Sequence, residues 1–281
     1  MNISDYIDHT NLKKDAKVED IIKLCESAKK YHFCTVCVPP YYVKACKEYL
    51  KDTTIQVCTV IGFPNGYSTK EVKSYEAIDA INNGADEIDM VININALKNK
   101  DYDYVKEEIE TIRDSIDGKV LKVIIETCLL DDEEVIKMTK ICNETFVNFI
   151  KTSTGFDKQG YDKHTLELIM KNKNSVLEVK ASGGIKTEKD AYELIEMGCT
   201  RLGTSHSVEI MEGEDNMSCC CHEEKHCDCD STCTCGCQEG KECTCNGNCN
   251  CSEDCTCGCQ EGKECTCGEK HSKKTCKCHN K

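Results

Sequence analysis

The fold is predicted from one segment, Val147-Asn148-Phe149-Ile150-Lys151-Thr152-Ser153-Thr154-Gly155. A short apolar run leads directly into a lysine, small hydroxyl residues and a glycine, which is typical of a buried strand that ends at a functional site. Lysine is rarely buried unless it is paired or has a chemical role. In a pocket of low dielectric constant the ammonium form is disfavoured, so Lys151 is a candidate for a neutral amine that attacks a carbonyl carbon. The alternative is a lysine that extends from the strand end into water.

The first 212 residues alternate short apolar runs with longer amphipathic runs, which is the pattern of repeated β-α units around a parallel sheet. Strands are expected at 6–9, 35–38, 56–61, 87–92 and 120–126, in the run that ends at Lys151, and at 176–180 and 201–203. Helices are expected after the N-cap Asp15, at 41–50, 69–83, 102–116, 131–146, 162–171 and 187–197, and in a short last segment. Eight strands, each followed by a helix, predict an α/β protein with a TIM (β/α)8 barrel. An open doubly wound sheet is the alternative.

In a TIM barrel the catalytic groups gather at the carboxyl ends of the strands. The expected strand ends carry Asp8, Asp89, Glu126, Lys151, Lys180 and the turns Gly183-Gly184 and Gly203-Thr204-Ser205. Lys151 and Lys180 would lie side by side on neighbouring strands, where each ammonium makes the other harder to protonate. We therefore interpret Lys151 as the amine and Lys180 as the neighbour that lowers its pKa. The alternative for Lys180 is a surface charge at the end of a strand.

Two acids and the glycine turns complete this expected site. Asp89 lies in the apolar run 88–91, where it either pairs with a lysine or relays protons. Asp8 either orients Lys180 or is a plain acid at a strand end. The glycine turns follow the last two strands, where barrels often bind phosphate through backbone N–H groups and hydroxyls. They predict a phosphorylated substrate, although a glycine pair also forms simple turns.

Eight segments together resemble the deoxyribose-phosphate aldolase family, strand by strand, over residues 1 to about 211. They are Tyr6–Leu12, Val36–Pro40, Val60–Pro64, Glu87–Asn93, Leu121–Thr127, Phe149–Gly155, Lys180–Ile185 and Arg201–Ser205. The resemblance implies a class I aldolase that reversibly cleaves 2-deoxy-D-ribose 5-phosphate to D-glyceraldehyde 3-phosphate and acetaldehyde. It implies no metal and no other cofactor for this reaction.

The resemblance also implies roles for single residues. Lys151 would be the Schiff-base lysine, Lys180 the partner that lowers its pKa, and Asp89 the acid of the proton relay. Asp8 and Lys122 would support the site, and the phosphate would bind among Gly183, Gly184, Gly203 and Ser205. Two features depart from some members of the family. His206 stands in place of a second phosphate-binding serine, and the last tyrosine is Tyr192, so no terminal tyrosine assists proton transfer.

The composition limits the partners of the protein. The formal net charge is −14 and no basic stripe is present, which argues against nucleic acid. No apolar run approaches the length of a membrane span and the first ten residues are polar, so we expect no membrane partner and a cytoplasmic location. A phosphorylated sugar is the expected substrate, and a homodimer through the barrel is left open.

The cysteines divide the chain into two compositions. Of the 27, eight precede Met217 in surroundings that suit packing residues: Cys25, Cys34, Cys37, Cys46, Cys58, Cys128, Cys142 and Cys199. Cys34-x-x-Cys37 is interpreted in the same way, rather than as a redox motif. The other nineteen are Cys219, Cys220, Cys221, Cys227, Cys229, Cys233, Cys235, Cys237, Cys243, Cys245, Cys249, Cys251, Cys255, Cys257, Cys259, Cys265, Cys267, Cys276 and Cys278.

The segment 219–281 contains no Leu, Ile, Val, Phe, Tyr, Trp or Met, so no hydrophobic core is expected there. Cys-x-Cys repeats run through it, and Cys233–Cys245 recurs identically as Cys255–Cys267. Soft thiolates select Zn²⁺, Cd²⁺ or Cu⁺, and nineteen of them would hold on the order of six or seven ions. The segment resembles a metallothionein. The alternative is a disulfide-linked secreted module.

We therefore expect a barrel at 1–212, a polar linker at 213–218 and a metal-binding tail without regular secondary structure at 219–281. Met217-Ser218 looks like the start of an independent protein, as in a gene fusion. One hypothesis is an aldolase with an independent metal-binding tail. Another is a metal-binding or metal-buffering protein in which the barrel is an inactive carrier, and a third is an aldolase regulated by metal on the tail. The presence of Lys151, Lys180 and Asp89 favours an active barrel.

Overall fold

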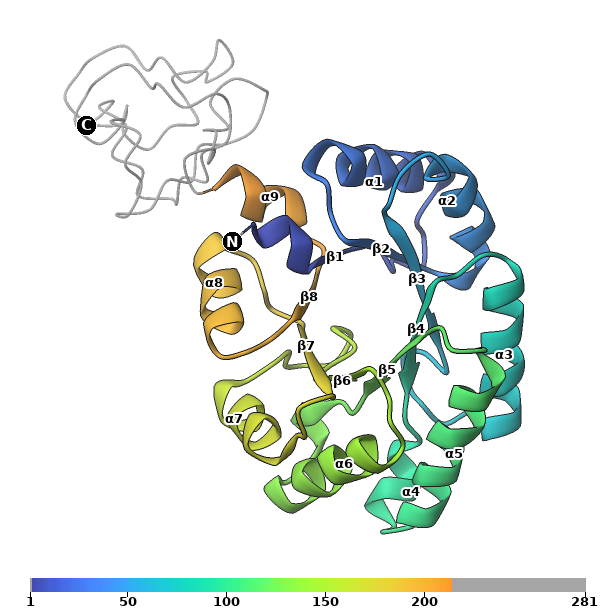
Figure 1. Ribbon diagram of the computed structural model, residues 1–281, viewed down its shortest axis with the longest axis vertical. Helices are drawn as coiled ribbons and strands as arrows, with labels where there is room; N and C mark the ends of the chain where they lie inside the picture. Colours follow the sequence, from blue (N-terminus) through green and yellow to red (C-terminus); the bar gives the residue numbers. More distant parts are fainter. Residues whose placement is uncertain (1, 214–281) are drawn as a thin grey trace, which may run out of the picture. The chain divides into compact units, whose positions relative to one another are not determined.

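The computed structural model describes residues 2–213. Eight parallel strands close into a barrel in the order β1 to β8 (Figure 1). They are β1 Ile7–Thr10, β2 Thr35–Val38, β3 Gln56–Ile61, β4 Glu87–Val91, β5 Val120–Ile124, β6 Phe149–Lys151, β7 Glu178–Ser182 and β8 Arg201–Thr204. The predicted TIM barrel of the α/β class is confirmed. The predicted tail, 219–281, and nearly all of the linker lie outside the described residues.

Helices surround this barrel (Figure 1). They are α1 Val18–Tyr31, α2 Val43–Tyr49, α3 Lys70–Asn82, α4 Ile94–Lys98, α5 Tyr102–Ser115, α6 Asp132–Glu144, α7 Lys163–Asn172, α8 Glu188–Glu196 and α9 Ser207–Glu212. Short 3₁₀ helices lie at η1 Ile3–Tyr6, η2 Pro40–Tyr42 and η3 Thr127–Leu129. Strands β2 and β3 have the predicted bounds, and most other predicted elements differ from the observed ones by a few residues at their ends.

Two helix starts differ from the prediction. The N-cap of α1 is Lys17 rather than Asp15, because the carboxylate of Asp20 turns back and accepts a hydrogen bond from the backbone N–H of Lys17 at 2.8 Å. Helix α4 was not predicted. Its N-cap Asn93 accepts a hydrogen bond from the N–H of Ala96 at 3.1 Å, and the helix is too short to show a periodic apolar pattern.

The barrel has an apolar outer layer and a polar interior. Successive side chains of a strand point to opposite faces of the sheet. Toward the helices, β4 presents the buried residues Ile88 and Met90, and β5 presents Val123. Toward the barrel axis, the same two strands present Asp89 and Lys122, both fully buried. The hydrophobic core therefore lies between barrel and helices, and charged groups fill much of the barrel itself.

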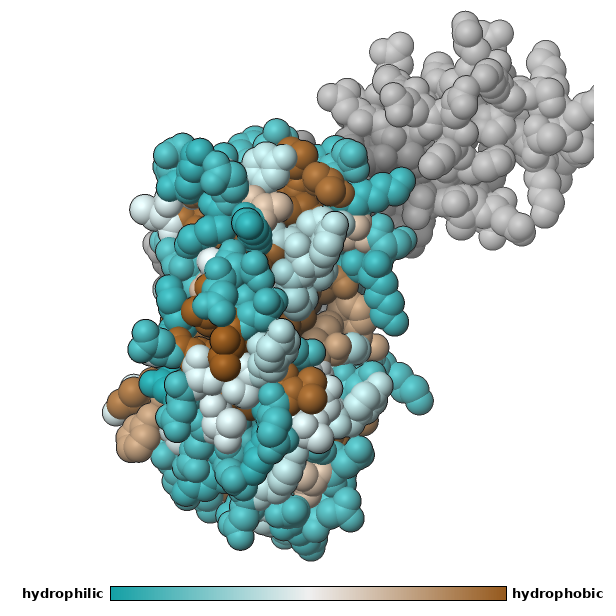
Figure 2. Space-filling model, turned by 90° about the vertical axis from the view of Figure 1, so that its right-hand side faces the viewer, coloured by the Kyte–Doolittle hydropathy of each residue, from teal (hydrophilic) through white to brown (hydrophobic). Residues whose placement is uncertain are grey.

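The outer surface shows no large apolar area on the face drawn in Figure 2. That face is mostly hydrophilic, with small hydrophobic areas separated by polar side chains. Tyr41, Tyr75 and Phe146 are among the most exposed large side chains. Within residues 2–213, no helix is long and apolar enough to cross a membrane.

Candidate active site

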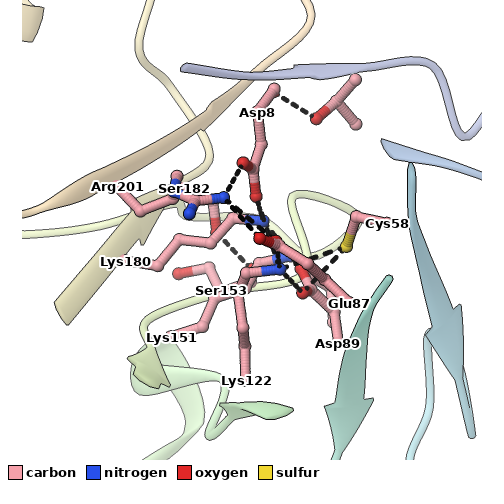
Figure 3. A network of polar contacts seen from close by, with 12 residues as sticks. Asp8, Cys58, Glu87, Asp89, Lys122, Lys151, Ser153, Lys180, Ser182 and Arg201 are labelled. Carbon is pink, nitrogen blue, oxygen red and sulfur yellow. Dashed lines mark hydrogen bonds and ion pairs between the residues drawn. The ribbon is translucent and has the colours of Figure 1, made fainter. Parts of the chain in front are cut away.

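An ionic cluster fills the barrel interior (Figure 3). Its members come from six strands: Asp8 on β1, Glu87 and Asp89 on β4, Lys122 on β5, Lys151 on β6, Lys180 on β7 and Arg201 on β8. The strand register brings them together, since Asp89 pairs with Lys122 and Lys151 pairs with Lys180. The cluster therefore contains each lysine and acid for which a catalytic or supporting role is predicted.

Asp89 lies at the centre of this cluster. Its Oδ2 atom accepts hydrogen bonds from Lys151 Nζ and Lys180 Nζ, each at 2.8 Å. Its Oδ1 atom accepts from Lys122 Nζ at 2.8 Å and from the thiol of Cys58 at 3.2 Å. Burial opposes the charge of Asp89, but the three neighbouring lysines outweigh it and hold the pKa of the carboxyl well below its usual range. Asp89 is therefore a carboxylate near neutral pH.

Lys180 and Lys122 are each held between carboxylates. Lys180 Nζ donates to both Asp8 and Asp89, and Lys122 Nζ lies 2.5 Å from Glu87 and 2.8 Å from Asp89. Burial alone would lower their pKa values, yet the neighbouring carboxylates raise the pKa of both lysines above the ordinary value. Both lysines therefore stay protonated, and neither is available as a nucleophile.

Neither Glu87 nor Arg201 was predicted to belong to the site. Arg201 donates to Asp8 Oδ1 at 2.6 Å and to Glu87 Oε2 at 3.0 Å, and its guanidinium group lies 5.2 Å from the ring centre of Phe149. The register of the strands provides a signal for both residues. Glu87 lies two positions before Asp89 and so on the same face, and Arg201 pairs with Lys180.

Lys151 differs from the other two lysines because it lines a cavity at the carboxyl ends of the strands. The cavity measures about 620 Å³, and neither Lys122 nor Lys180 lines it. The predicted phosphate residues Gly183, Gly184, Gly203 and Ser205 all do. Of the clustered lysines in the described chain, only Lys151 can therefore meet a bound substrate directly.

The glycines at this cavity are required for different structural reasons. Gly183 and Gly184 have φ angles of +83° and +85°, which side chains rarely adopt. Gly203 has a different role, because a Cβ atom there would lie 3.0 Å from Lys180 Cε and 3.1 Å from Ser182 Cβ. The missing side chain of Gly203 thus makes room for Lys180.

The prediction that these charged residues lie at the strand ends is partly wrong. Asp8, Asp89 and Lys180 lie within their strands and point to the barrel axis, where each one meets its ionic partners. Glu126 lies beyond β5 and has a left-handed φ of +51°. Its buried carboxylate accepts a hydrogen bond from the N–H of Thr154 at 3.1 Å, and burial raises its pKa. Glu126 therefore fixes the loop that follows Lys151.

The closed parallel barrel with a cavity at the carboxyl ends of its strands has the architecture of a barrel enzyme. A family model described as "DeoC/LacD family aldolase" matches residues 3–205. The chain belongs to this family and is an aldolase, as the resemblance of the barrel segments predicted. The match ends before the cysteine-rich segment, so the predicted metal ligands have no counterpart in it.

Similar proteins carry the name deoxyribose-phosphate aldolase. One from Clostridium tetani is 49% identical over 75% of this chain and 99% of its own length. One from Caldicellulosiruptor saccharolyticus is 50% identical over 74% of this chain and 96% of its own length. A solved structure, described as a tetrameric deoxyribose phosphate aldolase from Aeropyrum pernix, is 30% identical and has a TM-score of 0.70, covering 75% of this chain and 89% of that one.

Proposed function

We propose that the barrel reversibly cleaves 2-deoxy-D-ribose 5-phosphate to D-glyceraldehyde 3-phosphate and acetaldehyde through a Schiff base on Lys151. One observation carries this proposal: Lys151 is the clustered lysine that lines the cavity, while Lys122 and Lys180 do not. The names of the most similar relatives support the choice of substrate. Lys151 and the groups around it supply the chemistry, so the reaction is proposed to need no cofactor.

In the cleavage direction the amine of Lys151 attacks the aldehyde carbon C1 of the open-chain sugar, and loss of water leaves an iminium ion. The hydroxyl on C3 then loses its proton and the C2–C3 bond breaks. Its electron pair moves toward the iminium nitrogen, which gives an enamine and releases D-glyceraldehyde 3-phosphate. Protonation of the enamine at C2 and hydrolysis of the resulting iminium ion release acetaldehyde and restore Lys151.

The surrounding charges are assigned supporting steps in this proposal. Lys180, a fixed ammonium that shares Asp89 Oδ2 with Lys151, takes up part of the negative charge of that oxygen and so weakens its hold on Lys151 Nζ. The same Asp89 oxygen connects the two nitrogens, so protons are relayed through it and reside there only briefly. Asp8 orients Lys180, and Lys122 holds Asp89 in place.

The substrate phosphate is proposed to bind at the cavity wall formed after β7 and β8. Gly183, Gly184 and Gly203 line this wall and can offer backbone N–H groups, and Ser205 adds a hydroxyl. The N–H of His206 is directed to Thr204 Oγ1 at 3.0 Å, and its ring Nδ1 lies 3.3 Å from Ser205 Oγ. His206, which stands in place of the second phosphate-binding serine of some family members, therefore orients the serine beside it.

The test is reduction with borohydride in the presence of acetaldehyde, followed by mass spectrometry of the peptides. We expect a stable adduct on Lys151, and we expect Lys151→Ala to abolish both the adduct and the release of acetaldehyde. Lys189→Ala, at an exposed lysine of α8, is the control and should behave like the wild type. An adduct on another lysine, or full activity in Lys151→Ala, would show that the assignment is wrong.

We further propose that residues 219–281 bind soft metal ions through their nineteen cysteines. The Cys-x-Cys repeats and the lack of large apolar residues support this proposal, since a metal-thiolate cluster can order a segment that has no hydrophobic core. Zn²⁺, Cd²⁺ and Cu⁺ are the candidate ions. The native mass of the chain purified with Zn²⁺ or Cd²⁺, compared with its acid-denatured mass, should show several bound ions. A chain without ions and lighter by about two mass units per cysteine pair would mean disulfides instead.

The location and assembly of the chain follow as smaller proposals. A cytoplasmic location suits a reduced cysteine-rich segment, because thiols stay reduced in that compartment. A homodimer through the barrel stays a prediction, and its check is the native mass of the assembly. The tetramer described for the Aeropyrum pernix protein shows that a relative assembles further.

A further inference from the structure

Two cysteines face each other inside the barrel, directly beside the ionic cluster. Cys37 on β2 and Cys58 on β3 are partners in the strand register, and they are 1% and 0% exposed. Their sulfur atoms and a carboxylate oxygen of Asp89 all lie within 4.8 Å of one another. The proposed aldolase reaction uses neither thiol as a nucleophile, so it does not explain why the two thiols lie beside Asp89.

Two sulfur atoms and one carboxylate oxygen are a ligand set for a soft divalent ion. Zn²⁺ binds thiolate sulfur at about 2.3 Å and carboxylate oxygen at about 2.1 Å, so the ligand atoms of one tetrahedral ion lie roughly 3.5 to 4 Å apart. The observed group falls within reach of this geometry after small side-chain rotations. Burial is no obstacle to such a site, since structural thiolate sites are usually closed to solvent.

The charge of the interior also permits an ion. When a divalent ion binds two thiols, both protons leave to solvent and the total charge of the barrel interior stays the same. Lys122 Nζ already donates to Cys58 Sγ at 3.2 Å and would donate more strongly to a thiolate. Lys122 and Lys180 repel an added cation, so the site should be weaker than a cluster of thiolates alone.

We propose that Cys37, Cys58 and Asp89 form a binding site for Zn²⁺ or Cd²⁺ in the barrel core, and that an ion bound there stops the aldolase. The ion binds the carboxylate of Asp89, which would otherwise pair with both Lys151 and Lys180. It enters from the cavity past Lys151, whose Nζ lies 2.8 Å from Asp89 Oδ2. The inhibition rests on the proposed Schiff-base function, whereas the ion site itself does not.

With such a site in the barrel, metal uptake by the cysteine-rich segment would affect the activity of the enzyme. Nineteen cysteines in Cys-x-Cys repeats, which can hold each ion with several thiolates, would take up soft ions before the two-thiol site of the barrel does. The segment would then keep the barrel active until its own capacity is exceeded. Loss of activity should therefore begin late in a metal titration, after most ions have bound.

The experiment is a Cd²⁺ titration of the full chain under a reductant that contains no thiol. Acetaldehyde release and native mass are measured at each step. We expect the wild type to lose its activity as the last ion binds, and we expect Cys37→Ser and Cys37→Ala to keep it and to bind one ion fewer. Cys37 makes no hydrogen bond to the lysines or Asp89 in the described structure, so both variants should start with wild-type activity.

Cys142→Ser is the matched control, because Cys142 is equally buried but lies on α6 in the outer core. It should lose activity with Cd²⁺ as the wild type does. Equal inhibition of the Cys37 variants, or a saturated wild-type chain that stays active, would overturn the proposal. An inactive wild-type chain before any metal is added would instead contradict the aldolase function, while the missing ion in the Cys37 variants would still report on the site.

Discussion

Gly203→Ala tests whether the fixed position of Lys180 matters for catalysis. The new Cβ atom would lie 3.0 Å from Lys180 Cε, and since carbon atoms in contact are usually about 3.5 to 4.0 Å apart, one of them must move by roughly 0.5 Å or more. Lys180 cannot yield freely, because its Nζ is bonded to Asp8 and to Asp89 at 2.8 Å. The added methyl group should therefore lower the stability by about 1 to 3 kcal/mol.

The effect on catalysis should fall on kcat. A displacement of this order in a charged group beside the proposed nucleophile lowers the rate by roughly 10- to 100-fold. The backbone N–H of residue 203 is kept in the variant, so binding of the phosphate should change little. The assay is acetaldehyde release at several substrate concentrations, with urea unfolding to confirm that the variant is folded.

Ser205→Ala is the matched comparison, because it removes a proposed phosphate contact and leaves Lys180 untouched. It should raise KM and leave kcat near the wild-type value. A Gly203→Ala variant with normal kcat and raised KM would refute the reasoning, since it would mean that Gly203 serves the phosphate and not the position of Lys180.

Three further outcomes are expected. Lys73→Met should lower the free energy of unfolding by about 3 kcal/mol, because it leaves the fully buried Glu108 without its cation, Lys73 Nζ, which now lies 2.6 Å away. The urea midpoint measures this loss, and an unchanged midpoint would contradict the prediction. Burial lowers the pKa of His9 from 6.5 to about 4, so the folded state binds fewer protons than the unfolded state between these pH values. The free energy of unfolding should therefore fall by up to about 3 kcal/mol as the pH drops from about 6.5 to about 4. His9→Gln should flatten this pH dependence. Glu126→Ala should raise KM because the loop at Thr154 loses its anchor, whereas Glu126→Gln, which keeps an acceptor, should be milder.

The parallel barrel could be predicted because its signals are local. The run 56–61 is apolar almost throughout and is followed by a turn-rich loop, so β3 has the predicted bounds. Lys151 stands out for the same reason, since an apolar run leads directly into it. These features need only the alternation of strand and helix and no knowledge of which strands touch.

The interior cluster depends instead on register, which a single strand does not reveal. Arg201 begins β8 and resembles any charged residue at the start of a strand until its pairing with Lys180 is known. Strand β7 runs from Glu178 to Ser182 rather than over 176–180, and a shift of this kind decides whether Lys180 lies at the end or in the middle. Contacts between distant residues, not the local pattern, therefore fix the positions of the charges.

The closing pair of strands also bears on how the protein is made. Strand β1 pairs with β8, and Asp8 lies beside Gly203, so the ionic cluster is complete only when the last strand joins the first. During synthesis the earlier strands must wait for β8 to leave the ribosome. The 77 residues from 205 to 281 follow β8, so the barrel can close outside the ribosome while the later part of the chain is still attached to it. An active aldolase is then expected on stalled chains that end within the cysteine-rich segment.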